Sequence, residues 1–275
     1  MRVDQLGVQL HCLRHVVRNG LPEALASIRG LGLNVVELVS FPGCRGNPWG
    51  DFGGATDLPA RSIRAALNEA GLRCPSVMVN ERELAAEQID TVLGWVRGVG
   101  ADRVVLTAFG GPAGSTLEQW RATLARTNTH AERCRDRGIE FVLHTQPDLW
   151  APVEGRRPVD LLQDEVDPVL VRFEYDPSGA IMHGMDPASF LADRHGAIHA
   201  VHLRDGYPAP DPVPYLPALP LGHGGVDWDA FLRASRTAAV EWYFLEMEVA
   251  DPTAVVGALS SSLEQLAALG MPVSH

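Results

Sequence analysis

The stretch that decides the fold is Ala197–Asp205, AIHAVHLRD. Its apolar residues form the pattern of a short buried strand, which carries His202 near its end and finishes in Arg204 and Asp205. Polar residues at the end of a buried strand are typical of a parallel α/β barrel, where the C-terminal strand ends face the active site. The other strands of such a barrel should carry polar residues at the same level.

Seven further apolar segments fit this description and alternate with helical segments. The predicted strands are Leu6–His11, Asn34–Leu38, Arg73–Val79, Arg103–Thr107, Ile139–His144, Leu170–Asp176 and Trp242–Glu248. The predicted helices are Leu21–Leu31, Arg61–Ala70, Glu83–Val99, Thr116–Arg137, Val159–Glu165, Asp186–Arg194, Val226–Ala238 and about Pro252–Leu269. Eight β-then-α units predict a parallel sheet, and their number favours closure into a single-domain (β/α)8 TIM barrel over residues 1–275.

A doubly wound sheet is the alternative fold. It would require a glycine fingerprint such as GxGxxG after the first strand, and Leu10–Asn19 contains none. Two stretches rich in proline and glycine, Pro42–Pro59 and Gly206–Gly225, are predicted to be long loops, the first over the barrel mouth.

Charge and composition exclude several classes of partner. The net charge of −11 argues against a nucleic-acid partner, because an acidic surface repels phosphate backbones. We expect no membrane partner, since no stretch approaches the roughly 20 apolar residues that span a bilayer. The N-terminus lacks a signal-peptide apolar run, and the four cysteines include no CxxC pair. These features predict a cytoplasmic protein.

Four polar residues close apolar runs on the later strands: His144, Asp176, His202 and Glu246. If the strands are parallel, all four meet at one mouth, where two imidazoles and two carboxylates would form a divalent-metal site. As buried polar groups they would otherwise lack obvious partners. Taken singly, His202 could be a hydrogen-bonded core residue, and Asp176 could cap the turn that follows it.

Seven segments resemble, in order and over nearly the whole chain, the sugar phosphate isomerase/epimerase family of the xylose isomerase-like TIM barrel superfamily. They are GVQLHCLR, GLNVVEL, GIEFVLHTQ, FEYDPSG, IHAVHLRD, LGHGGVDWDAF and EWYFLEME. The resemblance implies one divalent ion held by Glu, Asp, His and Glu on strands five to eight, of which the last three match Asp176, His202 and Glu246. It also implies a carbohydrate or cyclitol substrate, and homodimers are frequent in the family.

The fifth strand departs from the family pattern. It ends in His144-Thr145-Gln146, where family members often have a glutamate or a His-Asn-His triplet. His144 then takes the ligand position and Gln146 that of the second histidine. A set with two histidines is softer than a carboxylate-rich one, which favours Mn²⁺, Zn²⁺, Co²⁺ or Fe²⁺ over Mg²⁺. Gly179 stands where a histidine often follows the sixth-strand aspartate.

Such a site would support isomerisation or epimerisation of a sugar, sugar phosphate or keto-polyol through an enediolate. Glu246 is the candidate base, and His144 the partner acid if it does not bind the metal. The family's epimerases pair glutamates from strands five and eight, and that pair is incomplete here. Two alternatives stay open: a dehydratase (lyase) of a keto-sugar or inosose on the same metal site, and a barrel that lost its chemistry and acts as a binding protein. A phosphodiesterase like endonuclease IV is disfavoured by charge and by too few ligands.

Six further residues are candidates for substrate contacts. They are His11, Glu37, Gln146, Trp150, Arg204 and His223. Arg204 could pair with a substrate carboxylate or phosphate, or form a salt bridge at the rim. Trp150 could stack on a sugar face or be buried in the rim. Glu37 could instead bridge neighbouring strand ends, and His223 is either a lid residue or an inert exposed histidine.

Overall fold

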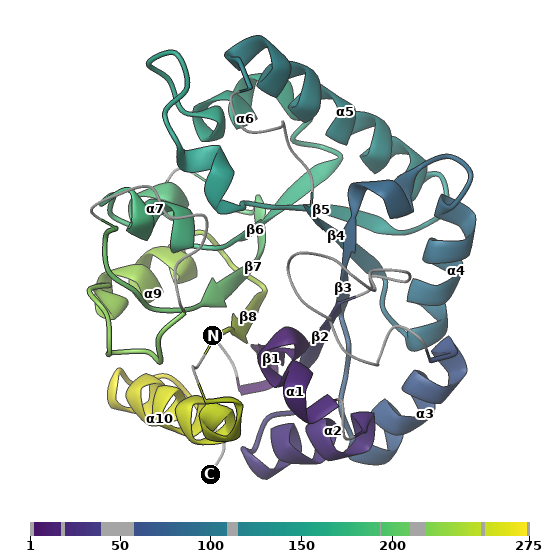
Figure 1. Ribbon diagram of the computed structural model, residues 1–275, viewed down its shortest axis with the longest axis vertical. Coiled ribbons are helices and arrows are strands. Elements are labelled where there is room, and N and C mark those ends of the chain that lie inside the picture. Colours follow the sequence, from purple (N-terminus) through teal and green to yellow (C-terminus); the bar gives the residue numbers. More distant parts are fainter. Residues whose placement is uncertain are drawn as a thin grey trace.

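Eight parallel strands close into a barrel in sequence order, with β8 paired to β1. The computed structural model describes residues 3–17, 20–39, 58–108, 115–192, 194–209, 218–248 and 251–273. The strands are β1 Leu6–Gln9, β2 Val36–Val39, β3 Ser76–Asn80, β4 Arg103–Ala108, β5 Glu140–His144, β6 Val171–Tyr175, β7 Ile198–Leu203 and β8 Trp242–Leu245. The predicted (β/α)8 TIM barrel is confirmed, and Figure 1 shows the strands inside a ring of helices.

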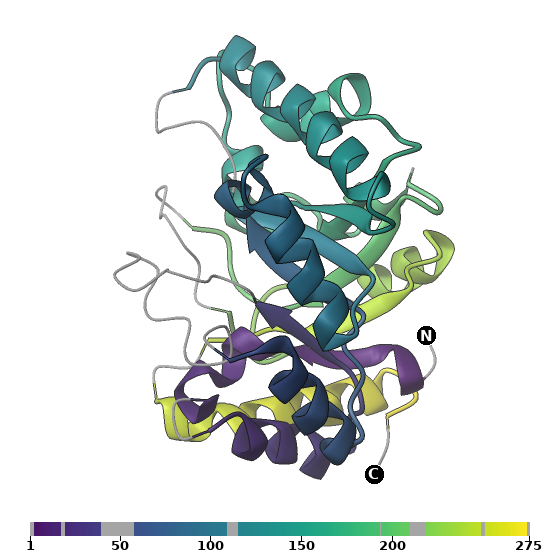
Figure 2. The ribbon, with the colours of Figure 1, turned by 90° about the vertical axis from the view of Figure 1, so that its right-hand side faces the viewer.

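The helices cover the outside of the strands. They are α1 Arg14–Val17, α2 Leu21–Gly30, α3 Ala60–Ala70, α4 Ile89–Val99, α5 Leu117–Arg135, α6 Leu162–Glu165, α7 Ser178–Met182, α8 Ser189–Ala192, α9 Trp228–Thr237 and α10 Val255–Ala268. Helices α2, α3 and α4 lie side by side along one flank (Figure 1, Figure 2). None of the helices in the described ranges combines the length and the apolar character that crossing a bilayer requires.

The helix ends follow local sequence signals. Helix α5 begins with a capping box in which Thr116 and Gln119 satisfy each other's backbone N–H groups. Helices α3 and α4 end at Gly71 and Gly100, which have φ of 67° and 99°. Glycine adopts this left-handed conformation without the steric cost that a Cβ imposes, so both helices stop where the sequence analysis predicted.

Several element ends differ from the sequence predictions. His11 lies in the 3-10 turn Leu10–Leu13, not on β1. The helix predicted over Asp186–Arg194 is reduced to α8, and α7 occupies the stretch after Pro177 that suggested only a turn. A proline just before a helix favours its start, which a turn interpretation overlooks. Within the predicted loops, residues 42–57 and 210–217 lie outside the described residues.

The barrel interior is filled by side chains. One apolar cluster contains Val35, Ala200 and Phe244, and a second contains Val39, Met78, Val105 and Val142. The large remaining core lies outside, between strands and helices. A filled interior is typical of this fold, and it leaves the C-terminal rim as the place where a ligand can bind.

Gly7 on β1 is required by a close backbone approach. A Cβ at this position would lie 2.5 Å from the carbonyl oxygen of Val35, a backbone atom beside the neighbouring strand β2. Because backbone cannot rotate away, Gly7→Ala should force the strands apart and lower the free energy of unfolding by about 1–3 kcal/mol. Urea denaturation followed by circular dichroism measures this loss.

Gly94→Ala is the matched control. Gly94 lies inside α4, and nothing lies within 4 Å of a Cβ built there. Alanine has the higher helix propensity, so this variant should gain up to about 1 kcal/mol. Equal stability of the two variants would contradict the close packing at Gly7.

Candidate functional site

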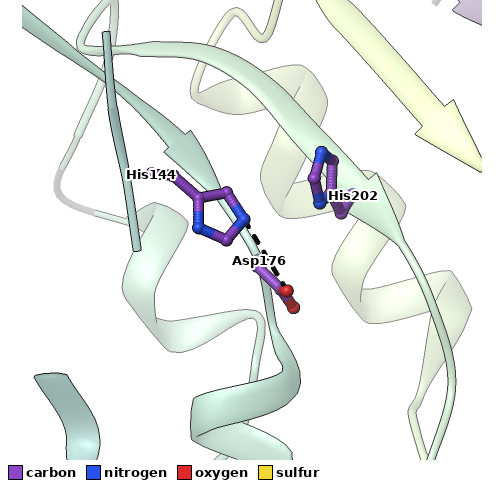
Figure 3. Close-up of side chains that lie close together, drawn as sticks. All are labelled: His144, Asp176 and His202. Atoms are coloured by element: carbon purple, nitrogen blue, oxygen red, sulfur yellow. Dashed lines mark ion pairs between the residues drawn. The ribbon is translucent and has the colours of Figure 1, made fainter. Parts of the chain in front are cut away.

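The predicted metal ligands lie at the C-terminal mouth of the barrel. His144 ends β5, Asp176 follows β6, His202 lies on β7, and Glu246 follows β8. One ligand atom from each of the first three lies within 4.8 Å of the others. Figure 3 shows His144 and His202 projecting beside Asp176, with the two imidazole ring centres 5.1 Å apart.

Glu246 joins this group through two contacts. Its Oε2 atom lies 2.9 Å from Nδ1 of His202. The NH1 group of Arg204 donates to Oε2 of Glu246 and to Oδ2 of Asp176, each over 3.1 Å. These four residues are buried, Glu246 being 9% exposed. The structure therefore gathers all four strand-end donors, with Arg204 between the two carboxylates.

Two imidazole nitrogens at the mouth face a carboxylate but make no well-aligned hydrogen bond within the described residues. They are Nε2 of His144, which is 3.7 Å from Oδ2 of Asp176, and Nδ1 of His202. The other ring nitrogen of His144 lies 3.4 Å from the hydroxyl of Thr107. A buried polar atom without a partner is costly, and two lone pairs that face each other repel unless a proton or a cation lies between them. The nitrogen and carboxylate donors fit a divalent cation.

The protonation states of the site differ from residue to residue. Burial, reinforced by His202, lowers the pKa of His144 to about 4, so this imidazole is neutral at pH 7. Burial would also lower the pKa of His202, but Glu174 and Glu246 raise it well above its ordinary value. Burial alone would raise the pKa of Glu246, yet Arg204 and His202 outweigh it and keep the pKa well below its usual range.

The Asp176 carboxylate is held in place by its own loop. Its Oδ1 atom accepts the backbone N–H of Ser178 over 2.7 Å, which leaves Oδ2 directed at Arg204 and the mouth. The backbone N–H of Asp176 donates to the hydroxyl of Thr145 over 3.1 Å. The capping role considered for Asp176 is thus present, and it orients the carboxylate toward the other donors.

Beneath these residues lies an inner polar layer, made of Glu37, Ser76, Glu174 and His202, each 0% exposed. The atoms of Glu37, Glu174 and His202 form a second group within 4.8 Å. Burial and the neighbouring Glu37 raise the pKa of Glu174 to about 8. The sequence analysis missed Glu174, although it precedes Asp176 by two residues and so shares its face of β6.

The other predicted substrate residues are spread over several environments. Glu37 is fully buried, so a ligand at the mouth cannot touch it in this arrangement. Gln146 and His11 are partly buried and follow β5 and β1, close to the mouth. His223 is exposed in the loop before α9. Substrate contacts by Gln146, His11 and His223 stay predictions.

Trp150 belongs to the packed rim, the alternative that the sequence left open. It is 2% exposed and lies 5.4 Å from the ring of Phe190 and 6.1 Å from that of Tyr175. Its indole also covers Gly179, where an added Cβ would overlap the ring. The resemblance suggests a histidine at position 179. The position of Trp150 explains why glycine is found there instead.

Asp205, the last residue of the AIHAVHLRD stretch, organises the loop that leads to α9. Its carboxylate accepts the backbone N–H groups of Gly206, Gly222 and Val226 and the indole N–H of Trp228. The two most distinctive motifs of the sequence, HLRD and GHGGVDW, are thus joined by one buried carboxylate. This role is structural, since the Asp205 carboxylate binds the loop and Trp228 at the start of α9.

Solved structures with the same fold share little sequence with this chain. A sugar phosphate isomerase/epimerase from Parabacteroides distasonis ATCC 8503 has a TM-score of 0.77 at 16% identity, covering 95% of this chain and 97% of its own. L-ribulose 3-epimerase has a TM-score of 0.68 at 14% identity, covering 98% and 94%. D-allulose 3-epimerase from Methylomonas sp. has a TM-score of 0.67 at 15% identity, covering 98% and 99%.

At such identities the solved structures establish the fold alone. No curated protein matches the chain in sequence. The family model described as xylose isomerase-like TIM barrel matches residues 25–268, which include every predicted metal ligand. The chain therefore belongs to the xylose isomerase-like TIM barrel family.

Proposed function

We propose that this protein is a metal-dependent isomerase or epimerase that acts on a sugar, sugar phosphate or keto-polyol through an enediolate. The observation that carries the proposal is the pair of buried imidazole nitrogens of His144 and His202, each of which faces a carboxylate at the barrel mouth. Two structures of the same fold are sugar epimerases, which supports a carbohydrate substrate, and a cyclitol is the further substrate class that we propose.

The cation would be held by Nε2 of His144, Nδ1 of His202 and the carboxylates of Asp176 and Glu246. When bound, it would supply Lewis-acid polarisation of the substrate carbonyl and of the neighbouring hydroxyl. A set with two imidazoles favours Mn²⁺, Zn²⁺, Co²⁺ or Fe²⁺ over Mg²⁺, which prefers oxygen ligands.

Glu246 is the proposed base for the proton next to the substrate carbonyl. It is ionised at neutral pH because Arg204 and His202 lower its pKa, so it can accept a proton at Oε2 or Oε1. Arg204 donates to this carboxylate and to Asp176, so it orients both. The contact with a substrate anion predicted for Arg204 stays a proposal, since this residue is 2% exposed.

The fifth strand bears on which reaction follows proton removal. Epimerisation with two bases needs an acid on the face opposite Glu246, and His144, with a pKa of about 4, is a weak candidate for holding that proton at pH 7. Loss of a β-hydroxyl can proceed with one carboxyl group, which takes the proton next to the carbonyl and returns it to the departing hydroxyl as water. This observation keeps dehydration of a keto-sugar or inosose as the second candidate function.

The metal proposal predicts that the purified protein holds about one divalent ion per chain, measured by elemental analysis. His144→Ala should lose most of it, because one of four ligands is removed. His195→Ala is the control: this exposed histidine precedes β7 at the opposite end of the barrel, where its Nδ1 lies 2.8 Å from the carbonyl oxygen of Thr237. Full metal retention in His144→Ala would contradict the assigned ligand set.

The chemical proposal predicts solvent exchange. Protein reloaded with Mn²⁺, Co²⁺ or Zn²⁺ should bring deuterium from heavy water into a keto-sugar or inosose next to the carbonyl, followed by NMR. Glu246→Gln should slow this by about 10²–10⁴-fold, the usual contribution of a general base. A ligand that binds without exchange, with or without metal, would instead identify a binding protein.

The lowered pKa of His144 predicts loss of stability in acid. Free imidazole takes up a proton below pH 6.5, whereas buried His144 does so only near pH 4, so the unfolded chain binds more protons in that window. Stability should therefore fall from pH 7 to pH 5 by about 2 kcal/mol from His144 alone. Urea titrations of chelator-treated protein test this, and His144→Asn should flatten the dependence. A slope unchanged in that variant would contradict the assignment.

A further inference from the structure

His202 connects the barrel mouth to the inner polar layer. Its Nδ1 atom lies 2.9 Å from Glu246 at the mouth, whereas its Nε2 atom lies 3.2 Å from Oε2 of Glu37. Strands β2 and β7 are not neighbours in the closed barrel, so the contact between Glu37 and His202 crosses the interior. Because Glu37 is 0% exposed, its carboxylate acts on the mouth only through other side chains.

The Glu37 carboxylate has a fixed orientation. Its Oε1 atom accepts the hydroxyl of Ser76, on the adjacent strand β3, over 2.6 Å. Oε2 is then left for His202, and each oxygen has one donor. A buried carboxylate accepts hydrogen bonds and donates none, so the ring nitrogen that faces it must carry the proton.

This assignment settles which nitrogen can bind a cation. Without a cation, His202 carries a proton on both nitrogens, because Glu174 and Glu246 raise its pKa. A cation that displaces one proton would take Nδ1, 2.9 Å from Glu246, because Nε2–H stays bonded to Glu37. Carboxylates that accept the second N–H of a metal-binding histidine fix its tautomer and raise its basicity. The same relation exists here across the barrel.

We propose that Glu37 is a positioning residue that holds His202 in the Nε2–H tautomer and so presents Nδ1 to the cation at the mouth. This inference rests on the proposed function for the presence of that cation. It reassigns Glu37 from a predicted substrate contact to a support of a metal ligand.

Glu174 has a different role in the same layer. Its Oε2 atom lies 3.3 Å from Nε2 of His202, slightly farther than that of Glu37, and its pKa of about 8 leaves it a neutral acid at pH 7. Glu37, in contrast, is fixed by Ser76 and accepts from His202. The two carboxyls are equally buried and contact the same nitrogen, so Glu174→Gln is a matched control for Glu37→Gln.

Zinc affinity, measured by calorimetry on the full chain, is the first readout. A glutamine amide offers both a donor and an acceptor to Nε2, so it no longer enforces one tautomer. Glu37→Gln should bind Zn²⁺ about 10–100-fold more weakly than wild type, and Glu174→Gln within about threefold of it. Ser76→Ala, which only releases the carboxylate, should give a smaller loss and serves if Glu37→Gln does not fold.

Tautomer state is the second readout, from ¹⁵N-imidazole NMR spectra of the zinc-free proteins at a pH that leaves His202 neutral. His202 should carry its proton on Nε2 alone in wild type and in Glu174→Gln, and on a mixture of nitrogens in Glu37→Gln. Unchanged affinity and tautomer in Glu37→Gln would overturn the proposal, as would equal losses in both variants. A third outcome would also overturn the proposal: wild type binds two zinc ions per chain, and each variant loses one. The inner polar layer would then itself be a cation site.

The experiment separates this inference from the proposed function. If wild type binds zinc but Glu37→Gln behaves like wild type, only the positioning role of Glu37 fails. If wild type binds no zinc, the metal-dependent function fails. The contact between Glu37 and His202 can still be tested, because it predicts an Nε2 proton on His202 that is protected from solvent exchange in wild type and not in Glu37→Gln.

Discussion

The site depends on one constraint, the parallel closure of eight strands in sequence order. Parallel strands bring their C-terminal ends to one rim, so residues as far apart as His144 and Glu246 reach the same point. A filled interior below them, with apolar clusters such as Val35, Ala200 and Phe244, prevents the rim from collapsing inward. Strand pairing and core packing together therefore hold donors that local interactions could not.

The charged groups that this closure gathers compensate one another. Arg204 lies between Asp176 and Glu246, and His202 lies between Glu246 and the inner carboxyls, so positive and negative groups alternate across the barrel. Each charge in this position loses its hydration, and only close partners offset that cost. These contacts orient the carboxylates and imidazoles relative to one another, and such orientation is what a precise ligand geometry requires.

The fold and the four strand-end donors were predictable, because an apolar run indicates a buried strand and the polar residue that ends it marks the rim. Four such runs end in His144, Asp176, His202 and Glu246. The contacts across the barrel interior were not predictable, since they depend on which residues face inward and on how far along the barrel axis each one lies. Glu174 lies inside the apolar segment Leu170–Asp176, and only its even spacing from Asp176 hints at the inward face. The short helices α7 and α8 lack the length that makes helical periodicity visible.

The packing of Trp150 over Gly179 has an evolutionary consequence. A side chain at position 179 and an indole at position 150 are mutually exclusive, so the two positions are epistatic: a larger residue at 179 is accessible only after the tryptophan has become smaller. A lineage that acquired this tryptophan first cannot gain a histidine at 179 by one substitution, so the turn after β5 restricts later change in helix α7.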